Sequence, residues 1–444
     1  MAADGWTPTR LGDLVEVKHG WPFKSEFFDP HLSGRPIVVG IGNFQYTGGF
    51  RFDSTAVKEY RDSYPKEFEL SPGDILLVMT CQTAGGEILG IPGRVPNDGR
   101  LYLHNQRMGK VVIRNSERIH SDYLYWLFLW REFNRELVTT ASGTKILHTA
   151  PSRIEAFVFD LPPLSEQRAI AHILGTLDDK IEQNRRMNET LEAIARALFK
   201  SWFVDFDPVR AKSEGRDPGL PPHLADLFPD SFEDSELGEI PKGWRIGRFG
   251  DVVAQLRDQT NPPLSPDALF HHFSIPAFDE GQSPRPEYGE SIKSLKLRVP
   301  TGVILLSKLN PAIERVWMVD VGPDERAVCS TEFLVLRALS PFTRTYAYCL
   351  ARSPLFRQQI EGLVTGTSKS HQRVQVDSIL NLAVVVTSPP IVAAFARSAD
   401  AMLARTLDCR RESRTLAVLR DALLPKLISG SLRVKDAERI TEVA

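Results

Sequence analysis

The chain has 444 residues, of which 42% are hydrophobic and 25% are charged, a balance typical of a folded globular protein with two or more domains. Its 54 Lys and Arg residues and 56 Asp and Glu residues give a net charge of −2, which excludes a nucleic-acid-binding protein with a uniformly basic surface. The four cysteines lie far apart and form no CxxC pair, which excludes a disulfide framework and a zinc site.

The N-terminal segment MAADGWTPTR is polar and lacks the apolar core of a signal peptide. The longest apolar run, residues 123–130, is too short to span a bilayer, so we expect a cytoplasmic protein. Residues 1–160 carry short β-rich runs punctuated by Gly and Pro, a pattern that predicts a mixed α+β domain. Strands are expected at 36–39, 75–78 and 110–113, and an aromatic helix near 122–138.

A long helix is predicted within residues 161–204, because the segment from Ser165 to Trp202 contains no Pro and a single Gly. Its apolar positions alternate in steps of four and three, the period of a coiled coil. The stripe consists of Ile170, Leu174, Leu177, Ile181, Asn184, Asn188, Leu191, Ala195, Leu198 and Trp202. The two asparagines in this stripe are expected to fix the register and orientation of a paired helix.

Residues 205–242 are rich in Asp, Pro, Glu and Gly, so we expect an irregular connector that buries little apolar surface. A second globular domain is predicted at 243–388, a second long helix at 389–430 and a C-terminal tail at 431–444.

The second half of the chain repeats landmarks of the first half in the same order. Trp6-x4-Leu11-Gly12-Asp13 recurs as Trp244-x4-Phe249-Gly250-Asp251. A constant offset of 223 residues then pairs Tyr123 with Tyr346 and continues to His148 and His371. Ordered matches along the whole length indicate an internal duplication.

The second helix is less regular, but Leu416, Leu419 and Leu423 give its end an amphipathic face, in which Pro425 predicts a bend or a stop.

The two helices can be arranged in two ways. One interpretation is that each helix covers its own domain. The duplication favours the other, in which the helices pair antiparallel. At ~1.5 Å per residue a helix of roughly 35 residues is about 50 Å long, and such a pair would hold the two domains at opposite ends about a pseudo-twofold axis.

Five segments are distinctive: Leu161-Pro-Pro-Leu-Ser-Glu-Gln-Arg-Ala-Ile170, Asp205-Phe-Asp-Pro208, residues 228–244, Ser307-Lys-Leu-Asn-Pro311 and Cys329-Ser-Thr-Glu-Phe333. They resemble the specificity subunits of type I restriction-modification systems. The resemblance covers nearly the whole chain. It implies two target-recognition domains that alternate with two helices paired as an antiparallel coiled coil.

The resemblance also implies a chain that binds double-stranded DNA but performs no chemistry. Two methyltransferase subunits would dock on it and methylate adenine N6 with S-adenosylmethionine, and two ATP- and Mg-dependent motor and nuclease subunits would complete the complex. Cofactors would then bind to the partner subunits and none to this chain. One departure is that the second copy has Ile391-Val-Ala-Ala-Phe395 where the first has Leu164-Ser-Glu-Gln-Arg168, which implies a different second docking surface.

Candidate DNA-contacting residues lie in loops where small residues precede cations and amides. Glycine lets a backbone approach a phosphate, Lys and Arg neutralise it, and Gln and His can reach base edges. The candidates in these loops are Lys145 and His148 in the first domain, and Lys369, His371, Gln372 and Arg373 in the second. An ordinary structural turn is the alternative for each loop. Further candidates are Gln106 and Arg107 in the first domain and Lys308, Asn310 and Arg315 in the second, and for each of these an ordinary solvated position is the alternative.

Two rival functions are less well supported. Asn261-Pro-Pro-Leu264 resembles the signature of a DNA adenine methyltransferase but lacks its final aromatic residue. Gly40-Ile-Gly42 lacks the third glycine and the following helix of a cofactor-binding turn. The other rival is a helical interaction scaffold that binds no DNA, which a duplex-binding assay with the methyltransferase partner would distinguish.

Overall fold

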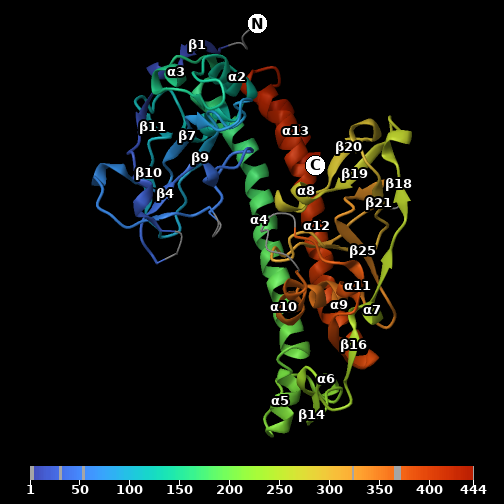
Figure 1. Ribbon diagram of the computed structural model, residues 1–444. Helices are drawn as coiled ribbons and strands as arrows, with labels where there is room; N and C mark the ends of the chain where they lie inside the picture. Colours follow the sequence, from blue (N-terminus) through green and yellow to red (C-terminus); the bar gives the residue numbers. More distant parts are fainter. Residues whose placement is uncertain (1–4, 30–32, 53–55, 323–324, 365–371, 444) are drawn as a thin grey trace. The chain divides into compact units, whose positions relative to one another are not determined.

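Figure 1 shows the chain as a computed structural model, which describes all residues except 1–4, 30–32, 53–55, 323–324, 365–371 and 444, and only the backbone of 440–443. The contacts divide it into unit 1, Met1–Ile181 with Thr415–Ala444, and unit 2, Glu182–Arg414. Each unit contains a strand-rich part, which we call head 1 (residues 7–161) and head 2 (residues 245–386), together with parts of two long helices.

Head 1 is built from short strands, and two buried ones, residues 37–39 and 75–78, consist entirely of Val, Ile and Leu. The strands and helices have the following bounds: β1 (Thr7–Arg10), β2 (Val15–His19), β3 (Phe28–Asp29), β4 (Ile37–Val39), β5 (Glu59–Tyr60), β6 (Glu69–Leu70), β7 (Ile75–Val78), β8 (Thr80–Cys81), β9 (Pro92–Arg94), β10 (Tyr102–His104), β11 (Met108–Ile113), α1 (Ser121–Phe128), α2 (Arg131–Thr139), β12 (Leu147–His148), α3 (Pro151–Glu155) and β13 (Val158–Leu161). The aromatic helix expected near 122–138 is thus two helices, which break at Leu129 and Trp130.

Head 2 follows a similar order. Its elements are β16 (Arg245–Arg248), α7 (Phe249–Val252), β17 (Val253–Leu256), β18 (Gln259–Thr260), β19 (Leu269–Phe273), α8 (Ile275–Asp279), β20 (Arg285–Tyr288), β21 (Lys296–Arg298), β22 (Ile304–Ser307), β23 (Val316–Met318), β24 (Ala327–Cys329), β25 (Phe333–Ala338), α9 (Arg344–Ala351), α10 (Pro354–Gly362), α11 (Val376–Leu380) and β26 (Ala383–Val386). Head 2 has the short helices α7 and α8 where head 1 has 3-10 turns, and its described residues include no named strands that match β8 and β12.

The sheets of the two heads share one topology. An antiparallel sheet has the order β2-β11-β7-β9 in head 1 and β17-β25-β22-β23 in head 2. A mixed sheet contains β5-β4-β10-β6 in head 1 and β20-β19-β24-β21 in head 2, with the parallel pair β4–β10 matched by β19–β24. The heads differ at the edges, where β3 extends one mixed sheet and β18 the other. The predicted α+β fold and internal repeat are confirmed by this correspondence.

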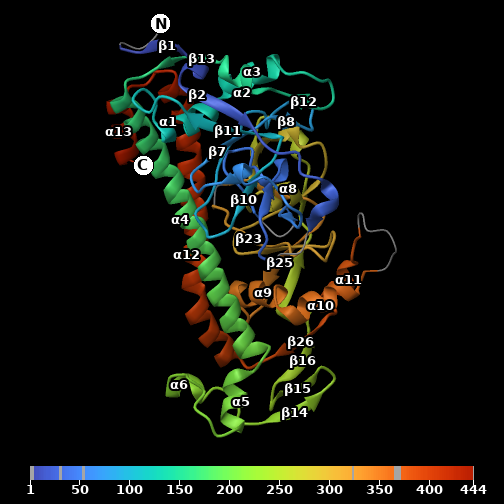
Figure 2. The ribbon, with the colours of Figure 1, turned by 90° about the vertical axis from the view of Figure 1, so that its left-hand side faces the viewer.

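The long helices are α4 (Leu164–Phe203) and α12 (Pro389–Ile428), and each contributes to both units. In unit 1, Leu174 and Leu177 share a hydrophobic core with Leu423 and Leu427, and the two segments lie side by side in Figures 1 and 2. Their packing buries apolar surface that neither segment could cover alone.

In unit 2, the Asn184 side chain lies against residues 409–413, and Nδ2 donates to the Glu412 carboxylate (3.0 Å) and the Cys409 carbonyl (3.4 Å). Fifteen residues further along α4, the ring of Phe199 lies 5.5 Å from that of Phe395. Residue numbers along α4 thus increase while those of the contacting residues in α12 decrease. The predicted antiparallel pairing is therefore confirmed, and the interpretation in which each helix covers only its own domain is wrong.

The end of the chain is more helical than its sequence suggests. The helix stop considered at Pro425 does not occur, because α12 continues to Ile428 and buries Leu427 completely. The predicted tail contains a further helix, α13 (Val434–Val443), whose Ala437 is fully buried in the core of unit 1.

The expectation that residues 205–242 are irregular is wrong. The segment contains α5 (Asp207–Ser213), α6 (Pro222–Ala225) and the hairpin β14 (Phe232–Ser235)–β15 (Gly238–Pro241). Phe206 packs on Trp244 (5.7 Å between ring centroids) and Phe228 on Trp202 (5.1 Å). A few aromatic anchors in a polar segment therefore suffice to fold it, although its average composition predicts an irregular connector.

Among the described residues, no helix is both long enough and apolar enough to cross a membrane. The same residues contain no cluster of three or more His, Cys, Asp and Glu side chains that could hold a metal ion.

Candidate nucleic-acid interface

Head 1 presents the loop 142–148 to solvent. Ser142 and His148 exchange both backbone hydrogen bonds (2.9 and 2.8 Å), which closes the loop. Gly143 has a φ of 102°, and a Cβ there would lie 1.9 Å from the Ile146 carbonyl oxygen, so only glycine fits. Lys145 and Ile146, near the end of this closed loop, are exposed.

The second polar segment of head 1, the turn after β10, lies beside this loop. The Met79 N–H donates to the Arg107 carbonyl (2.9 Å), and the Met79 carbonyl accepts from the Thr149 N–H (3.0 Å). The His148 ring is held by a hydrogen bond between Nδ1 and the Thr80 hydroxyl (3.1 Å). The fold thus brings the exposed Gln106–Arg107 turn and the Lys145–His148 loop together on neighbouring strands.

An aromatic side chain that the sequence did not single out lies beside this turn. The Gln106 N–H donates to the Trp21 carbonyl (3.0 Å), and the Trp21 side chain remains 36% exposed. Gly20 allows this approach, since a Cβ there would lie 2.3 Å from the Asn105 carbonyl oxygen. An exposed indole beside amides and cations is a surface on which a base can stack. Its sequence signal is one aromatic residue in the segment His19-Gly20-Trp21-Pro22.

Head 2 brings Lys308–Asn310 together with Gln372–Arg373. Asn310 adopts a left-handed conformation (φ 48°), its N–H donates to the Gln372 carbonyl (2.7 Å), and its side-chain oxygen accepts from the Gln372 N–H (3.1 Å). The side-chain oxygen of Asn310 therefore stabilises the loop, and it is not free to contact a base. Lys369 and His371 lie outside the described residues.

Arg373 is the most prominent exposed cation of this group. Its Nε and Nη2 donate to both oxygens of the Glu332 carboxylate (3.1 and 2.8 Å), while 58% of its side chain remains exposed. The pairing raises the pKa of Arg373 and fixes the plane of its guanidinium.

Backbone hydrogen bonds establish which positions of the two heads correspond. The Lys308 N–H donates to the Glu332 carbonyl, and the Lys308 carbonyl accepts from the Val374 N–H, as Met79 does with Arg107 and Thr149. Arg373 is therefore the counterpart of His148. The match of His148 with His371, which a constant offset of 223 residues predicts, is wrong by two residues. Equivalent sites carry Arg107 and His148 in head 1 but Glu332 and Arg373 in head 2.

Arg315 does not belong to this surface. It is 6% exposed, and its Nε and Nη2 each lie 2.8 Å from the Asp279 carboxylate. Because the guanidinium is buried and paired with a carboxylate, it is not available to a base, and the expectation that Arg315 contacts DNA is wrong. Nothing in its sequence neighbourhood marks it as buried.

The expected helix-pairing residues lie on the inner sides of α4 and α12. In unit 1, a single hydrophobic core contains Ile170, Leu174, Leu177 and Leu423, and Leu416 and Leu419 pack against it. Ile181 and Leu191 are partly buried, and Leu198 packs against the core of unit 2.

The start of α4 joins the helix to head 1 through buried polar contacts. The Trp6 indole donates to Glu166 (2.9 Å). The fully buried Gln167 accepts from the His120 N–H and donates to the carbonyls of Arg118 and Pro162, each at 2.8 Å.

The second copy replaces this polar junction with an aromatic one. Ala393 and Ala394 stand where Glu166 and Gln167 would be, and the ring of the fully buried Phe395 lies 6.3 Å from that of Tyr346 in α9 of head 2. The departure between the copies therefore alters how each helix joins its head. Gln167 is completely buried and cannot contribute to a docking surface.

The features that suggested a methyltransferase are not arranged as its site. Leu264, at the position of the missing aromatic residue, is 80% exposed at the end of a 3-10 turn. Gly40 precedes another short 3-10 turn, Ile41–Asn43, instead of a helix.

Comparisons with known proteins agree on one family. A sequence model of the type I restriction modification DNA specificity domain matches residues 3–193. The specificity subunit of the MjaIX type I restriction enzyme of Methanocaldococcus jannaschii is 25% identical, over 75% of this chain and 73% of that protein. The specificity subunit of the HindI enzyme of Haemophilus influenzae is 23% identical, over 88% of this chain and 98% of that protein.

The fold has a match among solved structures. The crystal structure of the type I restriction-modification S subunit from M. genitalium aligns with a TM-score of 0.55 and 13% identity, covering 95% of this chain and 96% of that one.

Proposed function

Because this chain belongs to the specificity subunits of type I restriction-modification systems, we propose that it is the non-catalytic subunit that selects the DNA sequence, with each head reading one half of a bipartite, asymmetric target. We call the part read by head 1 half-site 1 and the part read by head 2 half-site 2. The observation that carries the proposal is the pair of corresponding surfaces with different side chains, Arg107 and His148 in one head and Glu332 and Arg373 in the other. A shared scaffold with different exposed side chains suits two different short sequences.

In head 2, Arg373 is suited to read a base directly. An arginine that presents two N–H groups in one plane pairs with O6 and N7 of guanine in the major groove. Glu332 occupies Nε and one edge of Nη2, so the Nη1 side of the guanidinium remains to meet the base. Lys308 is suited to a phosphate contact, which positions the protein without specifying sequence.

In head 1, the His148 ring is oriented through Nδ1, which leaves Nε2 for a base edge. The exposed Arg107 and Lys145 beside it are suited to phosphates, and Trp21 to stacking. Since the net charge of the chain is −2, partner subunits would supply much of the remaining phosphate neutralisation.

The partners follow from the same proposal. Two methyltransferase subunits that carry S-adenosylmethionine would dock on the chain, and two restriction subunits that use ATP and Mg would join them. The outward side of α4 supports docking, because it exposes Met187 (47%) and Ile194 (45%) among charged residues. We also propose that the boundaries at 160, 204, 242, 388 and 430 separate recognition domains from helices, and that the complex acts in the cytoplasm, where the DNA lies.

The decisive experiment is to map N6-methyladenine genome-wide in cells that carry the methyltransferase subunit with and without this chain. We expect a bipartite methylated motif that is present only with the chain. Methylation that is unchanged when the chain is removed would contradict the proposal and favour a methyltransferase with its own specificity. A complex that assembles but prefers no duplex would favour the scaffold.

A further inference from the structure

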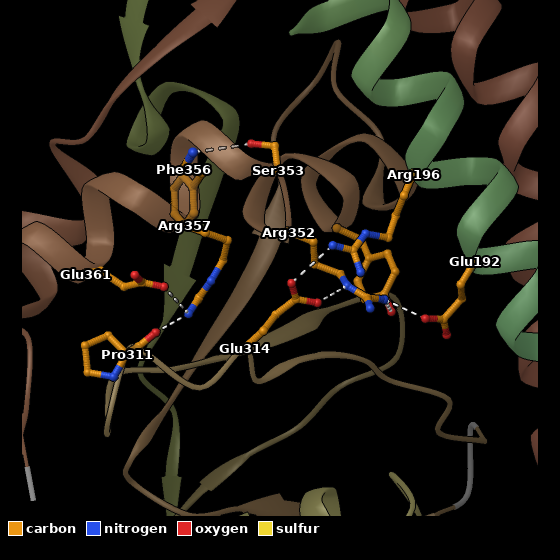
Figure 3. Close-up of polar contacts among 10 residues, drawn as sticks. Glu192, Arg196, Pro311, Glu314, Arg352, Ser353, Phe356, Arg357 and Glu361 are labelled. Atoms are coloured by element: carbon orange, nitrogen blue, oxygen red, sulfur yellow. Dashed lines mark hydrogen bonds and ion pairs between the residues drawn. The ribbon is translucent and has the colours of Figure 1, made fainter. Parts of the chain in front are cut away.

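Unit 2 contains a network of partly buried charges next to the candidate reading loop of head 2. Arg352, the residue after α9, donates from Nε to the Glu314 carboxylate and from Nη1 to the Glu192 carboxylate, both at 2.6 Å (Figure 3). Its guanidinium also lies over the Tyr348 ring, 4.9 Å from the centroid. The Arg352 and Glu192 side chains are only 12% and 13% exposed.

Glu314 belongs to the loop between β22 and β23, which also carries Lys308 and Asn310. The same loop is held a second time, because Arg357 of α10 donates to the Pro311 carbonyl (Figure 3). The loop that presents the candidate reading residues is thus fastened to the α9–α10 segment by two arginines.

Glu192 extends the network into the helix pair. It lies on α4, and its second carboxylate oxygen accepts from Arg410 of α12 (2.6 Å). The Glu192 carboxylate therefore joins both helices to Arg352, and through Arg352 to the loop of head 2.

Stability does not account for this arrangement. Buried ion pairs contribute little net stability, because the loss of hydration offsets the attraction between the charges. Head 1 has the same fold without an arginine at the corresponding position. Helix α1 matches α9 at an offset of 223 residues, and Leu129 therefore stands where head 2 has Arg352. What the network provides is a defined geometry, since charges with fixed partners in a buried site tolerate few alternative arrangements.

We propose that Arg352 is a positioning residue for the recognition of half-site 2, which holds the loop 308–314 in one fixed place on α4 through Glu314 and Glu192. The inference rests on the proposed function and adds a residue that determines specificity without touching DNA. Head 1 has its own junction with α4, through Gln167, so the effect of Arg352 is confined to half-site 2.

The test uses the complete complex with its methyltransferase subunits and duplex libraries in which one half-site at a time is randomised. The quantity measured is the ratio of methylation rates for the preferred base and for the other bases at each position. For R352M we expect this ratio to fall by about tenfold at half-site 2, comparable with the loss of a bidentate base contact, and to stay within about twofold at half-site 1. The matched control is R411Q, because Arg411 of α12 forms an exposed ion pair with Asp320 of the same head (2.7 Å), and it should leave both ratios within about twofold.

A ratio of rates does not depend on how much of the protein is folded, so partial unfolding cannot imitate the expected result. Unchanged discrimination at half-site 2 in R352M, or an equal loss at both half-sites, overturns the proposal. Should R352M fail to assemble, E314Q is measured in its place, because it removes only the charge at the loop end of the network. The same loss of discrimination is expected, at half-site 2 alone. If the unmodified complex discriminates at neither half-site, the proposed function itself has failed.

Discussion

Gln167 should be among the most sensitive residues of the junction between head 1 and α4. Its amide is fully buried, and it bonds to the backbone of Arg118, His120 and Pro162, each at 2.8 Å. The substitution Q167A removes these hydrogen bonds and leaves backbone groups that have lost their partner.

The expected cost follows from these contacts. A hydrogen bond contributes about 1 kcal/mol net, and a buried group left unpaired costs about 1–3 kcal/mol, so we expect Q167A to lower the free energy of unfolding of unit 1 by about 3 kcal/mol. Hydrogen exchange of the full chain, followed by mass spectrometry, measures this locally. Protection should fall by about a hundredfold in the peptides that contain residues 118–128 and 164–174.

Gln183 provides a matched control, since it is a glutamine on the same helix but exposed. The substitution Q183A should change stability by less than about 0.5 kcal/mol. Q167E should cost at least as much as Q167A, because it places a charge in the buried site and turns both donors into acceptors. A loss below about 1 kcal/mol in Q167A, or normal protection in Q167E, would show that the hydrogen bonds of Gln167 do not stabilise this junction.

Further predictions concern the reading surface, pH and the helix. Replacing Arg373 by Gln should reduce discrimination at one position of half-site 2 by about 5- to 150-fold and leave half-site 1 unchanged, as measured by methylation of randomised duplexes; a loss at both half-sites would contradict it. Burial lowers the pKa of His104 from 6.5 to about 4, so the stability of the neutral form is complete above pH 6.5 and lost as the pH falls through 4. We therefore expect the free energy of unfolding, measured by urea titration, to fall between pH 7.5 and pH 4.5 by about 2 kcal/mol less in H104N than in the natural protein; an equal fall in both proteins would contradict this prediction. Inserting one helical turn, about 5.4 Å, between Asp178 and Met187 should widen the unread gap by about one or two base pairs, and an unchanged gap would exclude a spacing role for the helix.

The features predicted well from the sequence are those with a local period or a repeated order. The stripe from Ile170 to Trp202 follows from its spacing alone, because a helix faces its partner every three or four residues. The α+β heads follow from short β-rich runs, and the duplication from landmarks such as Trp6 and Trp244. The register at His148 was missed by two residues, because loops of different length precede it in the two copies.

The candidate surface could be predicted only in part, because it depends on contacts between segments far apart in the chain. Polar loops indicated Arg107 and His148 separately, but their proximity depends on the pairing of Met79 with both segments. The burial of Arg315 depends on Asp279, 36 positions away, which no local pattern reveals. The same is true of Arg352 and Glu192, which are 160 positions apart.

The most direct test of modular reading is to exchange residues 1–160 for the corresponding head of a relative with a different target, and to map methylated adenines in the same cells. If each head reads its own half-site, half-site 1 changes to that of the relative while half-site 2 and the length of the gap are retained. A simultaneous change in both half-sites, or no change in either, would contradict modular reading.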